Sequence, residues 1–177
     1  MHIILKIWQS TVGELLNIAI VLIAIFCAHS AAAQQFDVVQ KSDSLWVLRL
    51  SDHNGAITGT WQLSYPVYRF ATADIDADGT IDAVVGVFKA SRYFPTPSRR
   101  VFIFKNFYGQ VRPLWLGSRL GGELIDFVVA GNAIRAIEET AQGYAVSEYT
   151  WKGFGMGFQS LVGTFDTLEE CYKLLEQ

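Results

Sequence analysis

Short apolar runs, many of them alternating with polar residues and each bounded by turn residues, recur along most of the chain. Three of these runs are rich in β-branched and aromatic residues, which favours strands over helices. They are Leu45–Leu50, Val101–Lys105 and Tyr144–Trp151. A glycine turn follows each run, at Gly55, Gly109 and Gly155, and glycine supplies the positive φ that tight hairpins need. The pattern therefore predicts a mostly β chain built from antiparallel hairpins.

The runs belong to a degenerate repeat. The segment Ile81–Val85 recurs as Ile125–Val129 about 44 residues later, and Phe36–Val39 is a fainter copy. A large apolar residue also stands at the same distance after each turn glycine, at Trp61, Trp115 and Leu161. This period is typical of β-propeller blades, but three units are too few to close a propeller. We therefore expect repeated antiparallel units of three to four strands in a partial, β-propeller-like assembly. An ordinary β-sandwich is the alternative.

The first 33 residues have the pattern of a signal peptide. Lys6 gives a basic start, Ile18–Phe26 is an apolar run, and Ala31–Ala33 offers small residues for a signal peptidase. We expect export, to a secreted, periplasmic or cell-surface location. The alternative is an uncleaved anchor, the one case in which a membrane would be a partner. The β-repeat domain is then expected over residues 34–165.

A short helix is predicted over residues 166–177. Asp166 is a suitable N-cap, and Glu169 three residues later completes a capping-box pattern. Apolar residues recur at helical spacing and would pack on the sheets. They are Leu168, Cys171, Tyr172 and Leu175. The other cysteine, Cys27, would leave with the signal peptide, so Cys171 is expected to be a buried, small apolar residue rather than half of a disulfide.

Four aspartates crowd into the loop Asp74–Asp82, between two strand-like runs. Such carboxylates repel one another unless a cation lies among them, and Ca²⁺ binds six to eight oxygens of this kind. The pattern predicts one calcium site in which Gly79 provides the sharp turn. Its expected ligands are Asp74, Asp76, Asp78, the carbonyl of Thr80, and Asp82. The alternative is a solvated acidic turn without a metal.

The loop differs from an EF-hand, because position 12 is Val85 rather than a bidentate Glu and the flanks favour strands. Instead, the segment Phe70–Gly86 resembles the calcium-binding blade of FG-GAP/VCBS repeats, which occur in integrin α-chain propellers and in many secreted bacterial proteins. The resemblance is carried by the acidic loop Asp74–Asp82. It implies a β-propeller-type blade in which the loop binds calcium.

Charge and residue content narrow the function. The 177 residues include 14 basic and 17 acidic side chains, a net charge of −3, which gives no electrostatic basis for binding nucleic acid. His53 is the one histidine after residue 33, so a Ser-His-Asp relay or a His-rich zinc site is not expected. Carboxylate pairs of the kind used by glycosidases are present at Glu123 with Asp126 and at Glu138 with Glu139, but we predict no enzyme.

Two further features are candidates for recognition. The segment Ala90–Arg100 combines aromatic, proline and arginine residues, a mixture enriched at interaction surfaces, and its alternative is a hairpin tip with solvated arginines. Four tryptophans could stack on sugars, but their repeat positions favour sheet packing. They are Trp46, Trp61, Trp115 and Trp151.

The combined expectation is an exported calcium-binding domain that acts in adhesion or in ligand or partner binding, with Ca²⁺ in a structural role. The expected partner is a protein or a glycan, or a second copy of the chain that pairs along an open sheet edge. Two alternatives are kept. One is an extracellular polysaccharide hydrolase, and the other is a structural subunit that completes a larger propeller.

Overall fold

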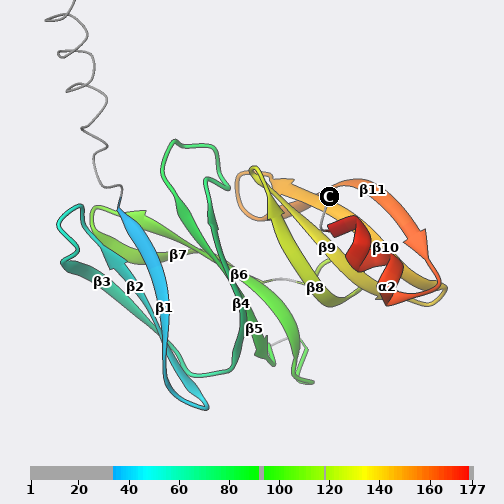
Figure 1. Cartoon of the computed structure of the whole chain (residues 1–177), viewed down its shortest axis with the longest axis horizontal. Helices are drawn as coiled ribbons and strands as arrows, with labels where there is room; N and C mark the ends of the chain where they lie inside the picture. The colour runs from blue at the N-terminus through cyan, green and yellow to red at the C-terminus, as the bar shows by residue number, and fades with distance from the viewer. Residues whose placement is uncertain (1–33, 92–93, 118, 176–177) are drawn as a thin grey trace, which may run out of the picture. The chain divides into compact units, whose positions relative to one another are not determined.

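A computed structural model describes residues 34–91, 94–117 and 119–175, and in this part the chain forms eleven strands and one helix (Figure 1). The first sheet contains β1 (Gln35–Ser42), β2 (Leu45–Ser51) and β3 (Ile57–Leu63). The second sheet contains β4 (Val67–Ala73), β5 (Asp82–Lys89), β6 (Ser98–Phe107) and β7 (Gln110–Leu116). The third contains β8 (Glu123–Ala130), β9 (Ala133–Thr140), β10 (Gly143–Trp151) and β11 (Met156–Phe165), and is followed by helix α2 (Leu168–Leu175).

The predicted fold class is confirmed. Every strand pair is antiparallel, and in each sheet the strands follow one another in chain order. The described residues form three sheets rather than the two of a simple β-sandwich. None of the sheets in the described residues is closed, so each has two edge strands rather than the chain having one open edge.

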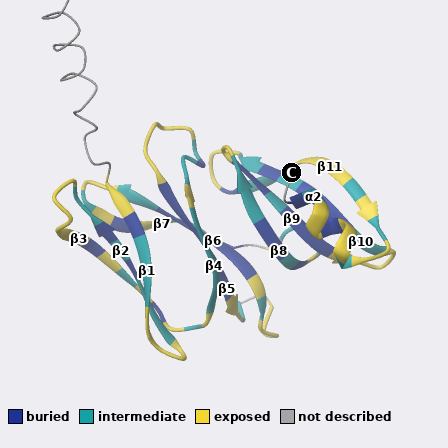
Figure 2. Cartoon of the chain, viewed as in Figure 1, coloured by how far each residue is buried: buried dark blue, intermediate teal, exposed yellow. Residues whose placement is uncertain are grey.

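The second sheet is buried on both faces, which Figure 2 shows as dark blue segments along β5 and β6. Consecutive side chains of a strand point to opposite faces of the sheet. In both β5 and β6, alternate side chains therefore enter different cores. Val85 of β5 and Phe104 of β6 pack toward the first sheet. Val84 of β5 and Ile103 of β6 pack toward the third sheet. These strands are therefore continuous apolar runs, as expected for strands covered on both sides.

The tryptophans take part in these two cores. Trp46 and Trp61 pack against the core between the first and second sheets, and Trp115 and Trp151 pack against the core between the second and third. Each is half-buried. The predicted packing role is thus confirmed for all four residues.

The repeat agrees with the structure in the last two strands of each sheet but not in the Ile-Asp motif. The predicted turns join β2 to β3, β6 to β7 and β10 to β11, and Gly55 and Gly109 have the expected positive φ, 80° and 79°. In the third turn the positive φ is at Gly153, 90°, rather than at Gly155 as predicted. However, Asp82 begins the second strand of its sheet, whereas Asp126 lies on the first strand, β8. The two motifs are therefore not equivalent in position, because similar strand sequences do not reveal which strand of a sheet they form.

The N-cap of helix α2 lies one residue later than expected, at Thr167 instead of Asp166. The Thr167 hydroxyl accepts a hydrogen bond from the Glu170 backbone N–H at 3.4 Å and donates one to the Glu170 carboxylate at 2.8 Å. This places the capping box on Thr167 and Glu170 instead of Asp166 and Glu169. Cys171 is fully buried against the third sheet and free, as predicted.

One expectation from the sequence concerns residues for which the structure gives no description. The predicted signal peptide, residues 1–33, lies outside the described residues. Within them, no helix has the length and apolar character needed to cross a membrane.

Candidate metal centre

The acidic loop connects β4 to β5 in the second sheet. Ile75, 1% exposed, anchors the start of the loop in the core between the second and third sheets. Gly79 has a φ of 87°, which confirms the predicted sharp turn, and Ala77 also has a positive φ of 58°. A left-handed conformation is unfavourable for alanine. The loop therefore holds a backbone path that its sequence does not favour locally, and backbone strain of this kind is concentrated at functional sites.

Three of the predicted ligands come together. Carboxylate oxygens of Asp74, Asp76 and Asp78 lie within 4.8 Å of one another, so this group could hold a metal ion. The Asp82 carboxylate lies outside this group. Asp82 is nevertheless close enough to Asp76 for the two charges to interact.

Hydrogen bonds inside the loop set the direction of two carboxylates. Asp74 accepts from the backbone N–H groups of Asp78 at 3.1 Å and Gly79 at 2.9 Å. Asp78 accepts from the backbone N–H of Thr80 at 2.9 Å and from its hydroxyl at 2.6 Å. The loop thereby fixes the direction of these two carboxylates, although Asp78 stays exposed.

Asp82 is the most deeply buried carboxylate of the loop. It is 0% exposed, and its Oδ2 accepts a hydrogen bond from the Ile75 backbone N–H at 3.0 Å. Burial raises the pKa of Asp82 to about 6. Its other oxygen, Oδ1, is buried without a hydrogen-bond donor, and the same holds for Asp76 Oδ1. Buried polar atoms normally have partners, so these two oxygens lack the donor or cation that such atoms require.

Lys105 on β6 is the cation that faces the loop. Its ammonium lies 2.6 Å from Asp76 Oδ2 and 2.7 Å from Asp78 Oδ2. Burial lowers the pKa of Lys105, but the hydrogen bonds to these two carboxylates raise it by more, so the pKa lies above its usual value. The Lys105 bond is also the largest cause of a lowered pKa of Asp78. The ammonium neutralises part of the loop charge but leaves the two buried Oδ1 atoms unpaired.

Sequence reasoning missed Lys105. It stands in an apolar run as a single charged residue, and nothing in its spacing from Asp76 indicates contact. The contact depends on the pairing of β5 with β6, which sets Ala83 opposite Phe104 and so brings the end of β6 next to the loop. Register between strands was the missing information.

Of the carboxylates considered for a glycosidase, two have structural partners and two are exposed. Asp126 forms a two-point ion pair with Arg69, at 2.7 and 2.5 Å. Glu138, 2% exposed, accepts hydrogen bonds from the Tyr149 hydroxyl at 2.8 Å and the Gly122 N–H at 2.8 Å. Glu123 and Glu139 are exposed and lie opposite each other on β8 and β9. His53 is exposed in the β2–β3 turn.

Comparison with known proteins adds no relative from which a role could be transferred. No protein-family model matches the chain, and no curated protein matches it either. The resemblance to FG-GAP/VCBS repeats therefore depends on the residues of the acidic loop alone.

Proposed function

We propose that this chain is a calcium-binding domain in which Ca²⁺ has a structural role and supports ligand or partner binding. The proposed ligands are Asp74, Asp76, Asp78, Asp82 and the carbonyl of Thr80. The observation that carries the proposal is the pair of buried, donorless oxygens, Asp76 Oδ1 and Asp82 Oδ1, beside the carboxylate group. A cation between the aspartates would satisfy both.

The donor set favours calcium over other ions. All proposed ligands are oxygens, which suits hard cations, whereas zinc prefers nitrogen and sulfur. The ligands come from a single irregular loop, and Ca²⁺ tolerates such variable geometry better than Mg²⁺, which requires near-octahedral coordination and retains its waters. Calcium would share the loop with Lys105 or displace it, because both cations interact with the same carboxylates.

A ligand-binding role is supported by the surface beside the loop. Asp78, Lys105, Phe107 and Tyr108 line one open depression. Tyr108 is 92% exposed and Phe107 54% exposed, and the two rings pack edge to face at 4.7 Å. Exposed aromatic residues at a rigid hairpin tip are common in recognition surfaces. The metal would keep the loop in place below this tip.

Export and partner pairing belong to the same proposal. The signal-like pattern of residues 1–33 supports an extracytoplasmic location, where structural calcium sites of moderate affinity are filled. The open edges of the three sheets offer unpaired backbone groups to a strand from another protein or from a second copy. Adhesion or partner binding is the function that these features support best.

The first test is a calorimetric calcium titration of the full chain. The unmodified protein is expected to bind one Ca²⁺, and Asp78→Asn to bind it about tenfold more weakly or not at all, because the site loses one charged ligand. Asp43→Asn, the same change at an exposed position in the β1–β2 turn, is the matched control and should bind as the unmodified protein does. Equal affinities in all three proteins would refute the calcium site.

A further inference from the structure

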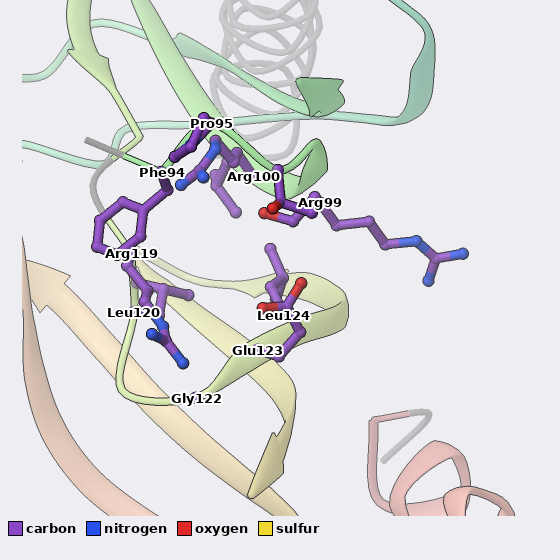
Figure 3. A pocket seen from close by; sticks show the side chains of 12 residues that line it. Phe94, Pro95, Arg99, Arg100, Arg119, Leu120, Gly122, Glu123 and Leu124 are labelled. Atoms are coloured by element: carbon purple, nitrogen blue, oxygen red, sulfur yellow. The ribbon is translucent and has the colours of Figure 1, made fainter. Parts of the chain in front are cut away.

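A second site lies at the other end of the second sheet from the acidic loop. A pocket of about 160 Å³ is enclosed by the β5–β6 connection, the start of β6 and the segment that leads into β8 (Figure 3). The residues that line it include Phe94, Arg100, Arg119, Leu120, Glu123 and Leu124. Residues from the second and third sheets therefore build it together.

Arg100 is the unusual residue of this pocket. It is only 5% exposed, and its Nε donates a hydrogen bond to the Lys89 carbonyl at 3.0 Å. No carboxylate in the described part of the chain lies within ion-pair distance of it. Arginine is rarely buried without a charged partner. The structure thus contains a buried guanidinium that reaches a pocket with its charge uncompensated.

Arg119 brings a second positive charge to the same place. The guanidinium carbons of Arg100 and Arg119 lie 5.6 and 5.8 Å from the centre of the Phe94 ring, within the range of cation–π attraction. Both guanidinium groups therefore interact with the same aromatic ring. Arg119 is exposed and also lacks a carboxylate partner among the described residues.

The neighbouring Arg99 also lines the pocket, but its guanidinium has partners of its own. Its guanidinium lies 5.0 Å from the centre of the Tyr68 ring and donates a hydrogen bond to the Ile125 carbonyl. Figure 3 shows this side chain extending away from Phe94. The alternative of a hairpin tip with solvated arginines is wrong for Arg100, which lies at the start of β6, is 5% exposed and donates a hydrogen bond to the Lys89 carbonyl.

We propose that this pocket binds the carboxylate of a hydroxylated organic acid, such as a uronic acid unit of a glycan. Arg100 would receive the carboxylate with its planar fork, which matches two carboxylate oxygens, and Arg119 would close over it from the rim. Glu123 lies across the pocket (Figure 3) and can accept a hydrogen bond from a hydroxyl of the same ligand. The proposal rests on the ligand-binding role given above and assigns it a chemical class.

The test is a calorimetric titration of the full chain with sodium glucuronate, with chloride and sulfate at equal ionic strength as comparisons. Glucuronate is expected to bind in preference to both. Arg119→Gln, at an exposed position that leaves the core intact, should weaken this binding about tenfold, the loss expected for one charge-assisted hydrogen bond. Arg112→Gln, the same change at an exposed position of β7 outside the pocket, should leave it unchanged.

Arg100→Lys separates geometry from charge. It keeps the positive charge but lacks the fork, so glucuronate binding should fall about tenfold or more while the circular dichroism spectrum stays that of the unmodified protein. Glucuronate that binds no better than chloride, equal losses in Arg119→Gln and Arg112→Gln, or tighter binding of sulfate would each overturn the proposal. A calcium titration of the same samples distinguishes this failure from failure of the metal site, because the two sites share no residue.

Discussion

At the scale of single residues, the aspartates of the acidic loop differ in what their surroundings require. Asp74 and Asp78 accept hydrogen bonds from the loop itself, whereas Asp82 is fully buried and keeps one oxygen without a donor. The sequence predicted that these residues gather, since all of them belong to one short loop and their spacing is local information. It could not predict the burial of Asp82, which depends on the sheets that cover β5.

Asp82→Asn should therefore have opposite effects with and without calcium. In EDTA at pH 7 the free energy of unfolding should rise by about 1–2 kcal/mol, because the carboxylate has a pKa of about 6 in the fold and its ionised form is disfavoured there. The amide can still accept from the Ile75 N–H. In saturating calcium the free energy of unfolding should fall relative to the unmodified protein, because a ligand is lost. Urea unfolding under both conditions measures this.

The control for this comparison is Asp43→Asn, which should change stability in neither condition. A change of the same sign with EDTA and with calcium would show that Asp82 has a purely structural role.

At the scale of elements, half-buried or buried aspartates of the first and third sheets form ion pairs with different basic residues. Asp37 on β1 pairs with Arg49 on β2, and Asp126 on β8 pairs with Arg69 on β4. In the third sheet β8 and β9 are joined by the tight turn Gly131-Asn132, where the second sheet has the acidic loop. Among the described residues, the candidate metal group therefore belongs to the longer of these two connections.

Strands and hairpin turns followed from local patterns, namely β-branched runs and glycine turns, and these predictions were right. Local patterns could not predict the ion-pair partners. Arg69 pairs with Asp126 and Lys105 with Asp76, and in each case the two residues lie far apart in the sequence. The helix cap was misplaced by one residue because Asp166 and Thr167 are both good caps, and only the backbone geometry decides between them.

Lys105→Met tests how β6 and the acidic loop cooperate. Without calcium the variant should be less stable by about 1 kcal/mol, because the carboxylates lose their counter-charge. Calcium should bind about tenfold more tightly, since the ion no longer competes with an ammonium group for Asp76 and Asp78. Calorimetric titration gives the affinity, with Lys41→Met, an exposed lysine of β1, as the control. Weaker calcium binding in Lys105→Met would contradict this competition.

At the scale of the whole described domain, the second sheet contributes to both large cores. Val85, Val87 and Phe104 pack toward the first sheet, and Val84, Val101 and Ile103 toward the third. Gly86 lies so close to Tyr68 and Phe127 that a Cβ atom there would stand 2.8 and 2.9 Å from their rings. Disturbing the second sheet should therefore disturb its neighbours as well.

Removal of calcium should accordingly lower the melting temperature of the domain in a single step. A fall of roughly 5–10 °C in EDTA is expected, reversed by Ca²⁺ but not by Mg²⁺, because a ligand that binds only the folded state stabilises it by about 2.7 kcal/mol at a hundredfold excess over its Kd. Scanning calorimetry with tryptophan fluorescence measures this. Two separate transitions, or no fall in EDTA, would contradict it.

The burial of the second sheet between two others has a consequence for when the protein matures. If the proposed calcium ion holds this middle layer and the chain is exported, the ion would be scarce in the cytoplasm and abundant outside the cell, so newly made chains would gain its stabilisation only after delivery. Delivery and folding would then be coupled through an ordinary ion gradient, with no separate chaperone signal needed to time the change.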